Sequence, residues 1–72
     1  MNYEEQIKDY LTENYYMKMT EAVKNKKRFA AKKLIKEVSK KFNIHVAEAV
    51  DNVWDWIESS FAEDDLKYFS AK

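Results

Sequence analysis

Neither glycine nor proline occurs anywhere in this chain of 72 residues. An average protein would contain several of each, together about 12% of its residues. Tight hairpins between strands usually need glycine, so a chain without it has few ways to turn one strand back onto the next. The sequence therefore predicts an all-α protein, and the lengths of its apolar patterns indicate a compact bundle of four or five short helices.

The length limits the chain to a single helical domain, residues 1–72, with a small core. There is no cysteine and only one histidine, so we expect no disulfide, metal or other cofactor. Two Trp, five Tyr and four Phe supply a dense apolar interior. No apolar run is long enough for a signal peptide or a membrane span, so we expect a cytoplasmic protein that does not enter a membrane.

The first helical pattern covers residues 2–24. Its apolar side chains fall on one face, and these are Tyr3, Ile7, Tyr10 and Leu11. Asn2 is the predicted cap. Asn14 tolerates the left-handed conformation common at helix ends, so we predict a break there, followed by a second short helix over Tyr15–Lys24. One continuous helix over 2–24 is the alternative.

Two strongly amphipathic helices follow, predicted over Arg28–Phe42 and Val46–Ser59. The apolar positions of the first are Ala31, Leu34, Ile35, Val38 and Phe42, and those of the second are Val46, Ala49, Val50, Val53 and Ile57. Asn43 is expected to end the first helix, and Ile44 to be buried in the turn. Trp54 and Trp56 lie on opposite edges of this apolar face. Trp54 is predicted in the core, and Trp56 is either a contact residue for a partner or a partly buried core residue.

A last short helix is predicted near the end of the sequence. Ser60 and Glu63 have the spacing of a capping box, in which each side chain bonds the backbone N–H of the other. The helix that would follow carries Leu66, Tyr68 and Phe69. We therefore expect it to start at Ser60.

The formal net charge is zero, but the charges lie in blocks of opposite sign. Residues 24–41 contain nine Lys or Arg and one Glu, whereas residues 42–65 contain seven acids and no Lys or Arg. The lysines opposite the apolar side of the first amphipathic helix form a lysine face, consisting of Lys32, Lys33, Lys36 and Lys40. Four carboxylates share an arc of about 80° on the second helix and form an acidic face, consisting of Glu48, Asp51, Asp55 and Glu58.

The junction of these helices resembles the helix-turn-helix of small phage-type repressors and Cro-like regulators. The residues that match it in order are Val38, Ser39, Phe42, Asn43 and Ile44. Asn43 stands where the turn glycine is usual, and Ala49 also fits. The sequence departs from the pattern at Asn52, which occupies an apolar position. The resemblance implies a DNA-binding regulator, and the alternative is an ordinary αα-hairpin.

The acidic face argues against insertion of the second helix into DNA, because phosphates would repel its carboxylates. We expect it to bind a protein with a basic surface, for example the DNA-reading face of a repressor. The predicted contact residues are Glu48, Asp51, Asn52, Asp55, Trp56 and Glu58. In this the chain looks like the small regulators and antirepressors of temperate phages and mobile elements, which modulate transcription. The alternative is a solvated acidic surface that pairs loosely with lysines of the neighbouring helix.

Three other functions fit the same pattern. Direct DNA binding would use basic side chains on phosphates, and the candidates are Arg28, Lys32, Lys33, Lys36 and Lys40. Inhibition of a host enzyme or defence complex would use the acidic face, and self-association is a further alternative. No nucleophile lies beside a base and no glycine-rich phosphate loop is present, so we do not expect an enzyme.

Overall fold

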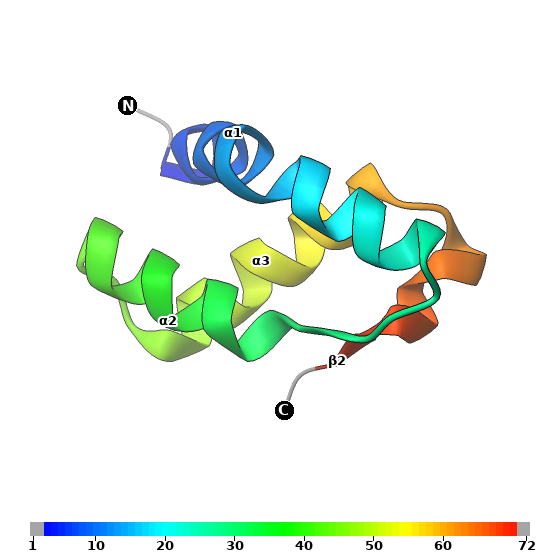
Figure 1. The fold of residues 1–72 in the computed structure, drawn as a ribbon. Helices are drawn as coiled ribbons and strands as arrows, with labels where there is room; N and C mark the ends of the chain where they lie inside the picture. Colours follow the sequence, from blue (N-terminus) through cyan, green and yellow to red (C-terminus); the bar gives the residue numbers. More distant parts are fainter. Residues whose placement is uncertain (1–2, 71–72) are drawn as a thin grey trace.

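The computed structural model describes residues 3–70. The chain forms an all-α bundle, as the composition predicts, with two very short strands added. In order, its elements are α1 (Tyr3–Lys24), β1 (Phe29–Ala30), α2 (Ala31–Phe42), α3 (Val46–Ser60), the 3₁₀ helix η1 (Glu63–Tyr68) and β2 (Phe69–Ser70). Figure 1 shows α2 and α3 as a pair, α1 crossing them, and the η1–β2 segment at one end beside the α1–α2 connection.

Helix α1 is continuous, so the predicted break at Asn14 is wrong. The Asn14 side-chain amide donates to the Tyr10 carbonyl oxygen at 2.8 Å and stays within the helix. The buried residues of α1 recur every fourth position on both sides of Asn14, and these are Ile7, Leu11, Tyr15 and Met19. One core-facing stripe therefore holds the whole helix in place. Tyr3, predicted on this stripe, is 59% exposed, and Asn2 lies outside the described residues.

Helix α2 begins at Ala31, three residues later than predicted, because Phe29 and Ala30 are extended. These two residues pair in parallel with β2, and Phe29 lies opposite Phe69. The Phe29 ring meets the Tyr15 ring edge-on, with centroids 6.5 Å apart. Phe29 is thus half-buried against α1 rather than placed among the lysines of α2.

The turn between α2 and α3 follows the prediction closely. Asn43 adopts the left-handed conformation (φ 53°, ψ 52°), and its N–H donates to the Ser39 carbonyl oxygen. The Ile44 N–H bonds the same carbonyl at 3.1 Å. In return, the Ser39 hydroxyl donates to the Ile44 carbonyl oxygen at 2.7 Å. Ile44 packs against the core, and His45 stands at the N-cap position of α3, without a side-chain capping bond.

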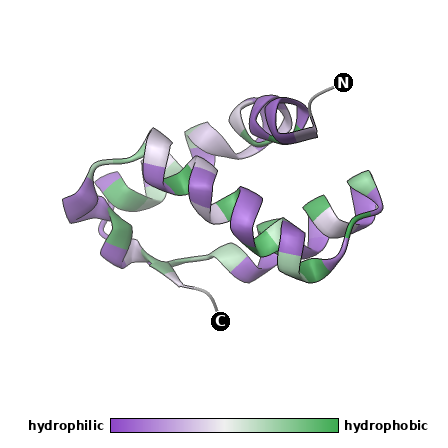
Figure 2. Cartoon of the chain, turned by 180° about the vertical axis from the view of Figure 1, so that it is seen from behind, coloured by the Kyte–Doolittle hydropathy of each residue, from purple (hydrophilic) through white to green (hydrophobic). Residues whose placement is uncertain are grey.

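The core lies between the inner faces of the three α-helices, where Figure 2 shows hydrophobic residues in green. Helix α3 contributes Ala49, Val53, Trp56 and Ile57. Trp56 is buried, which agrees with the core alternative for this residue, whereas Trp54, predicted in the core, is only half-buried. Val46, also predicted in the core, is 58% exposed.

The end of the described chain closes one end of the bundle. Helix α3 continues to Ser60 and the N-cap of η1 is Ala62, so the predicted capping box at Ser60 is wrong. Phe69 is buried, with its ring centroid 4.8 Å from that of Phe61. Phe61 in turn meets the Trp56 ring edge-on at 5.9 Å. This aromatic chain anchors η1 and β2 to α3.

Candidate functional site

The outer surface of α3 carries the acidic face that the sequence predicts. Its four carboxylate residues, Glu48, Asp51, Asp55 and Glu58, are all exposed. They project away from the core because Ala49, Val53 and Ile57 occupy the opposite side of the same helix and are buried. The structure therefore brings four negative charges together on one outward surface.

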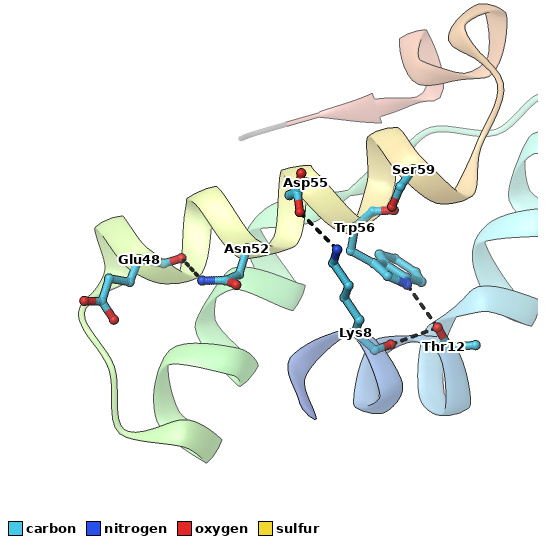
Figure 3. A network of polar contacts seen from close by, with 7 residues as sticks. All are labelled: Lys8, Thr12, Glu48, Asn52, Asp55, Trp56 and Ser59. Atoms are coloured by element: carbon cyan, nitrogen blue, oxygen red, sulfur yellow. Dashed lines mark hydrogen bonds and ion pairs between the residues drawn. The ribbon is translucent and has the colours of Figure 1, made fainter. Parts of the chain in front are cut away.

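One member of the acidic face is paired with α1. The Lys8 ammonium lies 3.2 Å from the Asp55 carboxylate, as Figure 3 shows. Both side chains are substantially exposed, so this ion pair is weak and orients Asp55 more than it stabilises the fold. Within residues 3–70, the carboxylates of Glu48, Asp51 and Glu58 form no ion pair. Three charges of the face are thus available to an external group.

A shallow hollow of about 320 Å³ lies where the start of α1 meets the acidic face. Its lining consists of Glu4, Asp51, Asn52 and Asp55. The Asn52 amide donates to the Glu48 carbonyl oxygen of its own helix at 2.8 Å (Figure 3). That bond uses one of the two amide N–H groups, and the carboxylates of Asp51 and Asp55 give the hollow a negative charge, which favours a cationic group.

Trp56 belongs to the core and not to the surface, which corrects its prediction as a partner-contact residue at the edge of the apolar face. It is 2% exposed. Its indole N–H donates to the Thr12 hydroxyl oxygen at 3.0 Å, and that hydroxyl donates to the Lys8 carbonyl oxygen at 2.8 Å. Figure 3 shows the indole pointing from α3 toward α1. Trp56 therefore joins the two helices and cannot contact a partner.

Trp54 is the aromatic residue that borders the acidic face. It is half-buried, and it lies three residues after Asp51 and four before Glu58, which places it one turn from each. Its ring thus forms an apolar border beside these carboxylates. The sequence analysis missed it because each tryptophan lies at an edge of the apolar face, and only the position of α1 decides which edge is covered.

The lysine face covers the outer side of α2. Its members Lys32, Lys33, Lys36 and Lys40 are exposed, and so is Arg28, which precedes β1 and is not helical. Among the described residues, no ion pair joins a lysine of α2 to a carboxylate of α3. The two charged faces point away from a common core, and neither neutralises the other.

Glu37 is the one acid among residues 24–41, and its contacts are with side chains of α1. The Tyr10 hydroxyl donates to its carboxylate at 3.2 Å, and the Tyr15 hydroxyl donates to the same oxygen. Burial raises the pKa of the Tyr10 phenol, and the negative charge of Glu37 and the hydrogen bond to it raise that pKa further. The Lys41 ammonium lies 5.0 Å from the centroid of the Tyr10 ring. This cluster holds α1 against α2.

No helix in residues 3–70 combines the length and apolar character that crossing a membrane requires. The same part of the chain holds no group of three His, Cys, Asp or Glu side chains arranged for a metal ion. Comparison of the chain with protein-family models, curated proteins and solved structures found no match.

Proposed function

We propose that this protein is a non-catalytic regulatory module that docks onto a basic surface of a DNA-binding protein, as an antirepressor does. The observation that carries the proposal is the outward surface of α3. Among the described residues, three of its carboxylates have no ion-pair partner, and they lie beside the half-buried Trp54. A DNA-reading surface presents Lys and Arg side chains, which are the complement of such a face.

The two parts of this surface have different roles in docking. Exposed charges mainly raise the association rate and select partners of opposite charge, and each adds little affinity. Affinity requires an apolar contact from which water is excluded, and aromatic side chains often supply it. Trp54, which borders the acidic face, provides that contact.

The same charges argue against reading DNA with α3. The α2–α3 pair has the left-handed turn residue of a helix-turn-helix at Asn43. In that motif the second helix enters the major groove, where Glu48, Asp51 and Glu58 would face phosphates. Their repulsion favours a protein partner for α3 over a duplex.

Two matched variants test the proposal. The acid-face variant is E48Q/D51N/E58Q, which removes three charges and spares Asp55 because that residue is paired with Lys8. The lysine-face variant is K32Q/K33Q/K36Q, which removes three charges of the opposite sign. Both sets of substitutions lie on exposed positions, so we expect both variants to fold like the original protein.

The measurement is capture of proteins from a lysate by the original protein and by each variant. We expect the original protein and the lysine-face variant to retain DNA-binding proteins, which added duplex DNA displaces. The acid-face variant should retain at least about tenfold less. Equal capture by the acid-face variant would refute the proposal. Capture of a nuclease or another enzyme, undisturbed by DNA, would favour the inhibitor function instead.

Direct DNA binding is the second candidate, and the exposed lysine face is the observation that favours it. Lysines on phosphates give affinity with little sequence preference and a steep dependence on salt. The test measures binding to mixed-sequence duplex DNA at about 50 mM and about 200 mM salt, where several phosphate contacts would cost two or more orders of magnitude in affinity. Loss of binding in the lysine-face variant supports this function, and no binding at low salt excludes it.

A further inference from the structure

The lysine face of α2 and the acidic face of α3 are complementary, yet they cannot meet within one molecule. We propose that copies of this protein associate head to tail, with the lysine face of one copy against the acidic face of the next. The two helices pack against each other through buried residues such as Val38 and Val53, so their charged sides point outward. Only a second molecule can bring the two faces together.

The dimensions of the two faces match. Lys32, Lys36 and Lys40 follow one stripe of α2 over eight residues, a rise of about 12 Å. The carboxylates of α3 cover ten residues, from Glu48 to Glu58, a rise of about 15 Å. In both faces the charges recur every three or four residues, so two helices lying side by side would place a lysine within one turn of each carboxylate.

The charge of the whole molecule permits this contact. The formal net charge is zero, so two copies do not repel each other at a distance as strongly charged proteins do. The local fields then dominate, with a positive side on α2 and a negative side on α3. Trp54, at the border of the acidic face, adds apolar area that the lysine stems of the next copy can cover.

Such an interface uses different surfaces on its two partners, so it does not close on a pair. Each copy that joins leaves one lysine face and one acidic face free at the ends, and the assembly grows with concentration. The acidic face that would dock a partner is covered in the assembly, so self-association and partner binding exclude each other. Assembly would thereby regulate docking, and this regulatory role rests on the proposed function.

The acid-face and lysine-face variants also test this interface, because each keeps the face that the other lacks. The measurement is the mass in solution by light scattering or sedimentation, over a range of concentrations at low salt. We expect the mass of the original protein to rise with concentration. Each variant alone should remain a monomer, and an equimolar mixture of the two should form a one-to-one dimer that cannot grow.

Salt provides a second measurement on the original protein. Raising the ionic strength from about 0.05 M to about 0.5 M shortens the screening length to a few ångströms, and it should lower the association constant about tenfold or more. A monomer at all concentrations at low salt would overturn the proposal. So would association of either variant alone to the mass of the original protein, or a mixture that stays monomeric.

A variant can lose association because it misfolds or because its interface is gone. A third variant, in which the charges of the two faces are exchanged, distinguishes these two causes. In the exchanged variant the lysines become glutamates and the carboxylates become lysines, as K32E/K33E/K36E/E48K/D51K/E58K. Self-association should return in it, because the faces are complementary again. The outcome is distinct from that of the capture experiment. A monomeric lysine-face variant that still captures its partner would support both proposals, whereas capture without any self-association would overturn this one alone.

Discussion

At the scale of single side chains, Glu37 determines how α1 meets α2. It is the one acid among the nine basic residues of positions 24–41. Two tyrosine hydroxyls of α1, those of Tyr10 and Tyr15, donate to one of its oxygens. Hydrogen bonds to a charged acceptor are stronger than those between neutral groups, especially where water is partly excluded. A charge of the wrong sign in a basic helix is thus explained by the helix that packs on it.

The raised pKa of Tyr10 makes the fold sensitive to alkaline pH. The folded phenol keeps its proton above its ordinary pKa of 10.0, whereas the unfolded phenol ionises there. The unfolded state then binds fewer protons, so the free energy of unfolding falls as pH rises above about 10. Below that pH the Tyr10 contribution to the free energy of unfolding is fully present. We expect a shallower loss in Tyr10→Phe, measured by urea unfolding between pH 9 and 11. Equal slopes in the two proteins would contradict the assignment.

Within residues 3–70, two residues that carry a Cβ atom adopt positive φ, namely Lys26 (56°) and Asn43 (53°). A side chain at Cβ makes this conformation costly, by about 1 kcal/mol or more, and asparagine tolerates it better than most residues. Lys26→Gly should therefore raise the free energy of unfolding by up to about 1 kcal/mol. Asn43→Ala should lower it by about as much, and Asn43→Gly should not. Chemical denaturation measures all three, and equal stability of the two Asn43 variants would refute the argument.

At the scale of elements, the predictions succeeded where a helix carried its own pattern. Helices α2 and α3 repeat apolar residues at helical spacing, and Asn43 marks the turn between them. The strands could not be predicted because each has two residues, too few to show alternation. They form because residues 29 and 69 meet in space. The burial of the two tryptophans could not be predicted for a related reason. Helix α1 covers Trp56, and nothing within α3 indicates which edge of its apolar face α1 will cover.

The η1–β2 segment depends on Phe69, which packs against Phe61 and pairs with β1. An aromatic pair of this kind contributes about 1 kcal/mol beyond its buried area. Phe69→Leu keeps an apolar side chain but removes the ring, and it should lower the free energy of unfolding by about 1 kcal/mol. Met17→Leu, at a position that is 78% exposed, is the control and should change little. If both variants unfold at the same denaturant concentration as the original, the aromatic contact does not hold this segment.

At the scale of the whole molecule, the chain is as compact as its length allows. Its radius of gyration is 11.5 Å, close to the value of about 11 Å expected for a folded domain of this length. The core nevertheless consists of few side chains and has no disulfide to support it. Domains of this size rarely exceed a stability of about 3–5 kcal/mol. One core defect can therefore unfold the entire protein.

Leu34→Ala tests how small this margin is. Leu34, in the first turn of α2, is fully buried. Its truncation should cost about 2–5 kcal/mol through lost burial and the cavity left behind, which is comparable to the whole stability. We expect a large unfolded fraction at 25 °C, visible as lost helical signal in circular dichroism. A cooperative transition as late as that of the original protein would show a much larger margin.

The positions of the two tryptophans give the molecule two separate optical reporters. Trp56 lies in the core with its indole bonded to Thr12, so its emission changes when the chain unfolds. Trp54 stands at the border of the acidic face, so its emission changes when another surface covers it. Trp54→Phe would leave fluorescence sensitive to unfolding and blind to docking. The fluorescence of two tryptophans only two positions apart thus distinguishes unfolding of the protein from binding of a partner.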